Sequence, residues 1–297
     1  MSRIEEALEK AVKMREMTKE VVSAEEPVRE KEPVREKEAV PPKFPEVTPA
    51  FDVGLMDKHV VMLTNPFSHA AEQYKKLRAR ILRATEQNHH NTIMITSSDM
   101  GEGKSLTSIN LAVALSSEID HTVLLVDSDL RNPSIHRYFG IQEPRGLSDY
   151  LKGEATLPEL LIKTGIGRLV ILPGGAPTEK SAELLSSDRM KTLVQEMKTR
   201  YDDRYIIFDT SPLLIIADAL SLSSCVDDVL FVIQEGRTAQ EKVARAISLL
   251  KGCSILGVVF NNSQQNISRD IHHYYYRYGS RAQHMAPPGK SADENKP

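Results

Sequence analysis

The sequence predicts an α/β domain with a mostly parallel central sheet flanked by helices. Six short apolar runs, rich in β-branched residues, alternate with longer stretches of helical periodicity. The runs are continuously apolar rather than alternating, which indicates strands buried on both faces, as in parallel sheets. The predicted strands are Thr92–Thr96, Thr122–Val126, Leu169–Leu172, Ile206–Phe208, Val229–Ile233 and Leu256–Phe260. The predicted helices span 69–83, 104–118, 179–200 and 238–251.

These elements place the folded unit at residues 60–263, about 200 residues, a length that suits one α/β domain. The preceding segment, 1–59, is highly charged and holds a hexapeptide repeat, 26–31 and 32–37, whose prolines forbid a continuous helix. An amphipathic helix is predicted at 2–20, either docking on a partner or marginal on its own. We expect both this segment and the tail, 264–297, to be largely disordered.

Composition excludes several classes of protein. The chain has 297 residues, a net charge of −3 and a pI near 6.3, without the basic footprint of a general nucleic-acid binder. No apolar run approaches the length of a membrane helix, and the charged first twenty residues do not resemble a secretory signal. Cys225 and Cys253 lack metal-ligand spacing, so we expect reduced thiols in a cytoplasmic protein.

A phosphate-binding loop follows the first predicted strand. The segment Ser97–Ser105 ends in Gly103, Lys104 and Ser105, which match the last three positions of G-x-x-x-x-G-K-[ST], while Ser98 replaces the first glycine. Backbone N–H groups of such a loop surround phosphate oxygens, the lysine reaches the β- and γ-phosphates, and the serine hydroxyl ligates Mg²⁺. The alternative is an ordinary glycine turn that opens a helix. The predicted nucleotide-binding residues are Asp99, Met100, Gly101, Glu102, Gly103, Lys104, Ser105 and Leu106.

Carboxylates end two further strands. Asp127 and Asp129 follow the second strand and Asp209 follows the fourth, and with Ser105 they form the predicted metal set. A single aspartate at such a position often only caps the next helix. Asn261 and Asn262, after the last strand, are candidates for reading the adenine edge or for an ordinary turn.

Together these motifs resemble the bacterial tyrosine kinases of capsule and exopolysaccharide assembly, especially the stand-alone autokinases of exosortase (PEP-CTERM)-associated systems. The family pattern contains P-G-E-G-K-[ST], D-x-D-x-R-x-P and D-T-P-P. This chain has Met100–Ser105, Asp127–Pro133 and Asp209–Pro212 at those places, with Met100 and Ser211 replacing prolines. The resemblance implies the architecture of P-loop NTPases of the ParA and MinD kind. The ParA- and MinD-like ATPases themselves carry a signature lysine five residues before the P-loop lysine, where this chain has Asp99.

The resemblance also implies phosphate acceptors and an oligomer. Four tyrosines cluster in the tail, Tyr274, Tyr275, Tyr276 and Tyr278, and the family phosphorylates such a cluster. An E-x-x-R-x-x-R helix closes a ring of subunits in the family, and Glu72, Lys75 and Arg78 occupy those positions here. An intrahelical Glu72–Lys75 pair is the alternative.

The predicted reaction is transfer of phosphate from Mg-ATP to the tail tyrosines of a neighbouring subunit. Lys104 and Mg²⁺ would neutralise charge on the transferred group, and Asp127, or alternatively Asp129, would accept the tyrosine proton. Arg131 would orient the loop after the second strand, or form a structural salt bridge. The alternatives are a ParA- or MinD-like ATPase and a non-catalytic, nucleotide-gated assembly subunit with the tail as a docking strip.

The expected partners are further copies of the chain and a separate membrane adaptor of the polysaccharide co-polymerase type, because family members respond to such an adaptor. We expect no nucleic-acid partner. The expected location is the cytoplasm, peripheral to the inner membrane through the adaptor.

Overall fold

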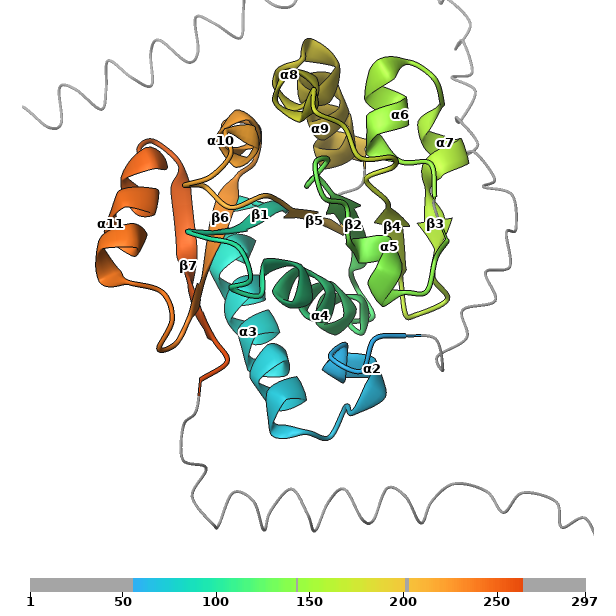
Figure 1. Cartoon of the computed structure of the whole chain (residues 1–297). Helices are drawn as coiled ribbons and strands as arrows, with labels where there is room; N and C mark the ends of the chain where they lie inside the picture. Colours follow the sequence, from blue (N-terminus) through green and yellow to red (C-terminus); the bar gives the residue numbers. More distant parts are fainter. Residues whose placement is uncertain (1–55, 143, 201–202, 264–297) are drawn as a thin grey trace, which may run out of the picture. The chain divides into compact units, whose positions relative to one another are not determined.

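The computed structural model describes residues 56–142, 144–200 and 203–263, which form a seven-stranded sheet between two layers of helices (Figure 1). The strand order is β3-β4-β2-β5-β1-β6-β7, and every pair is parallel except β3 with β4. The strands are β1 (Thr92–Ser97), β2 (Thr122–Asp127), β3 (Ile162–Lys163), β4 (Leu169–Leu172), β5 (Arg204–Asp209), β6 (Asp228–Gln234) and β7 (Ser254–Asn261). The predicted mostly parallel sheet is confirmed.

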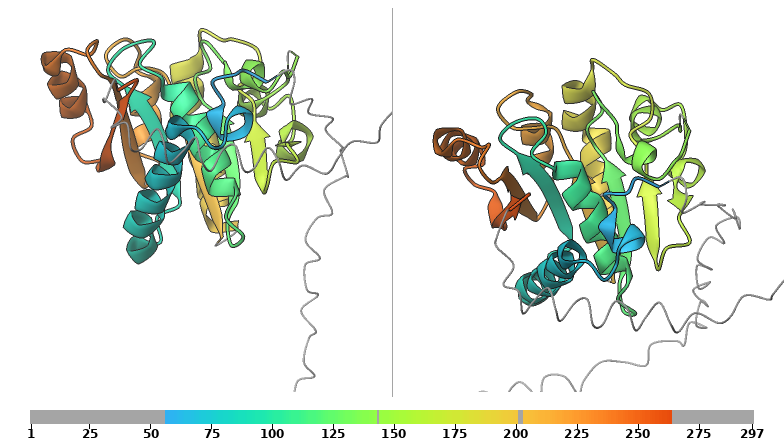
Figure 2. Two further views of the ribbon diagram at one scale, coloured as in Figure 1. Left: turned by 90° about the horizontal axis from the view of Figure 1, so that it is seen from below. Right: turned by 60° about the horizontal axis from the view of Figure 1, so that its bottom comes forward.

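Helices cover both faces of this sheet. Helices α3 (His69–Thr85) and α4 (Lys104–Ser116) pack against one face and lie in front of the strands when seen from below (Figure 2). The other face carries α8 (Ser181–Ser186), α9 (Asp188–Arg200), α10 (Asp218–Ser223) and α11 (Gln240–Leu249). The remaining helices are short: α2 (Val61–Thr64), η3 (Glu86–Asn88), α5 (Ile135–Tyr138), α6 (Leu147–Lys152) and α7 (Leu157–Leu160).

The central strands are buried on both faces, as their continuous apolar sequences predict. In β1, Ile93 and Ile95 pack in the cluster beneath α3 and α4, while Met94 between them packs in the cluster on the opposite face. This alternation follows from the two-residue period of a strand. Apolar residues at every position are therefore needed where both faces are covered.

Strand β7 departs from the prediction that all six strands are buried on both faces. It lies at the edge of the sheet, and Val258 and Phe260 are exposed, with 66% of Phe260 accessible. A run of apolar residues cannot distinguish a central strand from an edge strand, because neighbours far apart in the sequence decide which faces are covered.

The structure also corrects two predicted boundaries. The single helix expected at 179–200 is two helices, because Ser187 has an extended backbone and its hydroxyl accepts a hydrogen bond from the Met190 N–H, 3.2 Å away. Met56 and Val60 pack in the core with α2, so the folded unit begins before residue 60. The short helices and the two-residue antiparallel strand β3 were not predicted from the sequence.

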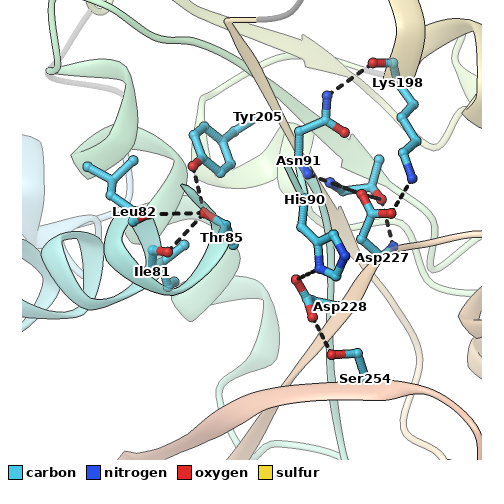
Figure 3. Close-up of polar contacts among 11 residues, drawn as sticks. Ile81, Leu82, Thr85, His90, Asn91, Lys198, Tyr205, Asp227, Asp228 and Ser254 are labelled. Carbon is cyan, nitrogen blue, oxygen red and sulfur yellow. Dashed lines mark hydrogen bonds and ion pairs between the residues drawn. The ribbon is translucent and has the colours of Figure 1, made fainter. Parts of the chain in front are cut away.

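Buried polar contacts fix the amino ends of β1 and β6 (Figure 3). The Asp227 carboxylate accepts hydrogen bonds from the N–H and the hydroxyl of Thr92 and pairs with Lys198. Asp228 pairs with His90 at 2.8 Å. This network lies at the opposite ends of the strands from the phosphate loop.

The helix expected at 2–20, the repeat and the tyrosine tail lie outside the described residues. Among the helices in the described part of the chain, none is both long and apolar enough to cross a membrane.

Candidate nucleotide and metal site

The predicted phosphate loop joins β1 to α4 at the carboxyl edge of the sheet. Gly101 and Gly103 have positive φ angles, 74° and 94°, which an L-residue rarely adopts. Helix α4 begins at Lys104 and is 13 residues long, so its positive end faces the loop. The Lys104 side chain is buried beside the strand-end carboxylates. This is the geometry in which backbone N–H groups and a lysine hold phosphate oxygens.

The loop is held by contacts within it and by the segment after β6. The buried Glu102 carboxylate accepts hydrogen bonds from the Asp99 N–H at 3.0 Å and from the Thr238 hydroxyl at 2.5 Å. The Asp99 carboxylate pairs with Lys242 of α11 at 2.6 Å. The position of the ParA-type signature lysine therefore carries an aspartate whose charge is already paired.

The other predicted nucleotide-binding residues are placed as follows. The side-chain amide of Asn261 donates to the Glu102 carbonyl at 3.0 Å, so it braces the loop. Asn262 has a φ of 56°, the turn conformation that was its alternative interpretation. Met100 is 57% exposed, and Leu106 lies half-buried in the first turn of α4.

Two predicted metal ligands meet at the ends of adjacent strands. Asp127 and Asp209 are register partners in β2 and β5, and both are fully buried. One oxygen of Asp127 accepts from the N–H groups of Ser134 and Ile135, at 2.8 and 3.0 Å. One oxygen of Asp209 accepts from the Ser108 hydroxyl at 2.9 Å. The second oxygen of each carboxylate is buried without a hydrogen-bond partner in the described chain.

This environment disfavours negative charge on both groups. Burial raises the pKa of Asp127 well above its ordinary value, and the charge of Asp209 raises it further. Burial also raises the pKa of Asp209 to about 6, although the Lys104 ammonium opposes the shift. Two adjacent carboxyl groups with orphaned oxygens are a site whose charge a bound cation would balance.

These residues fit Mg²⁺, which prefers carboxylate and hydroxyl oxygens. The Ser105 hydroxyl approaches both Asp209 and the Ser134 hydroxyl, the latter at 3.4 Å. No cluster of three or more His, Cys, Asp or Glu suited to a metal occurs within the described residues. Phosphate oxygens and water would therefore complete the coordination, as is usual for Mg²⁺ bound with a nucleotide.

Asp129 and Arg131 lie on the loop after β2. Asp129 accepts from the N–H of Asn132 at 3.2 Å, and burial raises its pKa while Lys104 lowers it. Arg131 is 3.6 Å from Asp218 on α10, measured from its Nε atom to a carboxylate oxygen. Asp218 was not among the predicted site residues.

The three candidate interface residues of α3 make contacts within the chain. Lys75 pairs with Glu72 at 2.5 Å, the intrahelical alternative, and also donates to the Pro66 carbonyl at 3.0 Å. Arg78 pairs with Glu118 at 2.9 Å. The ring interface stays a prediction. The four acceptor tyrosines lie outside the described residues.

Sequence reasoning missed several residues that the fold brings to the site. Ser108 lies one helical turn after Lys104, so the helical period provided a signal for it. Ser134, Asp218, Thr238 and Lys242 have no such signal, because only the packing of separate loops and helices brings them here.

Comparisons with known proteins agree with this geometry. A family model described as "AAA domain" matches residues 90–255. The tyrosine-protein kinase YwqD of Bacillus subtilis is 35% identical over 74% of this chain and 92% of its own length. The solved kinase domain of the Escherichia coli tyrosine kinase ETK is 29% identical, with a TM-score of 0.64 over 70% of this chain and 83% of that one.

A more distant structural similarity concerns the fold. The septum site-determining protein MinD of Pyrococcus horikoshii, solved with Mg-ADP, is 25% identical. It superposes with a TM-score of 0.50 over 62% of this chain and 76% of that chain. The predicted P-loop NTPase architecture is confirmed.

Proposed function

The chain belongs to the bacterial tyrosine kinases and is an ATP-dependent protein-tyrosine kinase, and on that premise we propose that it phosphorylates its own tail tyrosines with Mg-ATP. The observation that carries the proposal is the pair of buried carboxylates, Asp127 and Asp209, with unpartnered oxygens beside Lys104 and Ser105. Such a pair is costly in an empty site and useful in one that receives a metal nucleotide.

The roles of the site residues follow from their chemistry. The N–H groups of Gly101–Ser105 bind the phosphates, and Lys104 neutralises charge on the transferred group. Ser105, Asp127 and Asp209 hold Mg²⁺, which would supply positive charge to the phosphate oxygens. Asp129 stands as a further candidate ligand, although it already caps its own loop.

A base must accept the proton of the tyrosine hydroxyl, whose ordinary pKa is near 10. Asp127 remains the first candidate for this base, as an alternative to its role as a ligand of Mg²⁺, because a bound cation would lower the pKa that burial raises. Asp129 is the alternative, because it is less deeply buried and an incoming side chain reaches it more easily. If Asp127→Asn leaves full autophosphorylation, the base is not Asp127.

We place the acceptor residues in the tail, at Tyr274, Tyr275, Tyr276 and Tyr278, and propose that the tail of one subunit enters the site of another. The subunits would form a ring through α3, and a separate membrane adaptor of the polysaccharide co-polymerase type would activate it. The activity would then regulate exopolysaccharide polymerisation or export, with the enzyme in the cytoplasm beside the inner membrane. Membership of the exosortase-associated subgroup stays a prediction.

Labelled ATP with Mg²⁺, followed by phosphopeptide mapping, tests the proposal on the full chain. We expect label on the tail tyrosines of the unmodified protein. It should be lost in Lys104→Met and in a variant with Tyr274, Tyr275, Tyr276 and Tyr278 all changed to Phe. Lys152→Met, at an exposed lysine of α6, is the matched control and should keep the label. ATP hydrolysis without tyrosine label, even with a candidate adaptor segment added, would instead favour a ParA- or MinD-like ATPase or a nucleotide-gated assembly subunit.

A further inference from the structure

Asp218 is a buried carboxylate without a hydrogen bond. Its side chain is 0% exposed, and neither oxygen has a hydrogen-bond partner in the described chain. It is the first residue of α10 and lies close enough to Asp129 for its charge to raise the pKa of that carboxyl, which places it beside the nucleotide site. An orphaned buried carboxylate costs several kcal/mol by the general rule for charged groups, so it calls for an explanation.

The only cation within ion-pair distance, in the described part of the chain, is Arg131. Its Nε atom lies 3.6 Å from an oxygen of Asp218, and 42% of its side chain is exposed. A guanidinium group has five N–H donors, so an approach through Nε leaves the terminal Nη groups available for another acceptor. The two partners therefore differ in exposure: the carboxylate is fully enclosed, while the arginine side chain is partly exposed.

The loop that carries Arg131 also carries Asp129 and directly follows Asp127, the last residue of β2. The Ser128 N–H donates to the Asp209 carbonyl at 2.8 Å, and the Thr178 N–H donates to the Leu130 carbonyl at 2.9 Å. These backbone contacts fix the course of the loop. They do not fix the Arg131 side chain, whose one ion-pair partner within the described residues is Asp218.

We infer that Asp218 is a positioning residue, which holds the guanidinium of Arg131 so that its free N–H groups face the phosphoryl group being transferred. This inference rests on the proposed function and adds to it a residue from outside the three nucleotide motifs. Stability alone does not account for the pair, since apolar side chains of similar volume usually stabilise such a position as well or better.

The test compares kcat and KM for ATP in four full-length proteins: the unmodified chain, Arg131→Ala, Asp218→Asn and the double variant. We expect each single variant to lower kcat about tenfold or more and to change KM less than about threefold. If Asp218 acts only through Arg131, the double variant should be no slower than the slower single variant. Independent, multiplying losses, or an Asp218→Asn protein with normal kcat, would overturn the inference.

Chemical rescue of activity by added guanidinium distinguishes a positioning role of Asp218 from a purely structural one. Millimolar guanidinium should restore part of the activity of Arg131→Ala, because the ion can occupy the place beside Asp218. It should not rescue the double variant, which lacks the carboxylate. Equal rescue of both proteins, or of neither, would contradict the positioning role.

A matched control separates stability from catalysis. Asp228→Asn removes another buried carboxylate, which pairs with His90 (Figure 3). This pair lies at the amino ends of the strands, opposite the ends that carry the phosphate loop. It should lower Tm and leave kcat unchanged. If Asp218→Asn does not fold, Asp218→Glu replaces it, and the longer carboxylate should still shift kcat more than KM.

ATP hydrolysis is measured beside tyrosine phosphorylation in every protein. A chain that hydrolyses ATP without labelling tyrosine would refute the proposed acceptor, while the same four-protein comparison of hydrolysis rates would still decide the role of Asp218.

Discussion

On the scale of single residues, Asp209 makes the site sensitive to pH. Its pKa is about 6 in the folded protein, against 3.8 for an ordinary aspartate, so the folded state binds this proton more tightly than the unfolded state does. The carboxyl therefore lowers stability as pH rises from about 4 to about 6, and its full cost is present above that range.

Asp209→Asn removes the charge while keeping an oxygen for the Ser108 hydroxyl. Without nucleotide or Mg²⁺, we expect it to raise the free energy of unfolding at pH 8 by up to about 3 kcal/mol, a gain that shrinks as pH falls toward 4. Urea unfolding at several pH values measures this, with the exposed Asp120→Asn as the control. The variant should also lose the stabilisation that Mg-ATP gives the unmodified protein. A gain in stability that is the same at every pH would contradict a pKa of about 6 for Asp209.

Gly103 has two reasons to be glycine. Its φ is 94°, and an added Cβ would lie 1.9 Å from the amide nitrogen of Asn261. Gly103→Ala should therefore abolish ATP binding and lower Tm. Gly165→Ala is the matched control, because its φ of 72° imposes a similar backbone strain, of about 1 kcal/mol, while nothing lies within 4 Å of the added carbon. Fluorescent-nucleotide binding and thermal unfolding distinguish the two, and equal losses would show that backbone strain alone explains the glycine.

On the scale of elements, the segment between β6 and α11 acts as a brace for the phosphate loop. Thr238→Val keeps the shape of the side chain but leaves one oxygen of the buried Glu102 without its donor. We expect a loss of about 1–3 kcal/mol in the free energy of unfolding and weaker ATP binding, because a buried acceptor loses its hydrogen bond.

Thr199→Val provides the comparison for Thr238→Val. Thr199 is exposed and donates to the carbonyl one helical turn before it in α9, so its loss should change stability by less than about 0.5 kcal/mol. If Thr238→Val loses no more stability than Thr199→Val and binds ATP as tightly as the unmodified protein, the segment between β6 and α11 is not a brace.

On the scale of the whole molecule, phosphorylation should change the oligomer. Four phosphotyrosines add about −6 to −8 charges at pH 7 to a chain whose net charge is −3. Repulsion between such tails would open a ring of subunits, so we expect the mass from light scattering to fall after incubation with Mg-ATP. The variant with all four tail tyrosines changed to Phe should keep its mass. An unchanged mass in the phosphorylated, unmodified protein would contradict the prediction.

The sequence alone determined the class of the fold, and it located the predicted phosphate loop and the predicted metal-binding aspartates at the ends of strands. Continuous apolar runs indicate strands buried on both faces, and a phosphate loop is a local motif. Both features can therefore be predicted from a few neighbouring residues. The same local patterns wrongly predicted that β7 is buried on both faces and that α8 and α9 are one helix. Both the burial of a strand and a one-residue break in a helix depend on residues that are distant in the sequence.

Only the tertiary structure decided how the site is held together. Asp127 and Asp209 are far apart in the sequence and meet because β2 and β5 are adjacent in register. Asp218 reaches the site from α10, Thr238 from the segment between β6 and α11, and Lys242 from α11 itself. Their partners, Arg131, Glu102 and Asp99, are separated from them by at least 87 positions. A sequence motif identifies the residues that carry the chemistry. Their charged partners lie far away in the sequence, so only the packing of the folded chain brings them together.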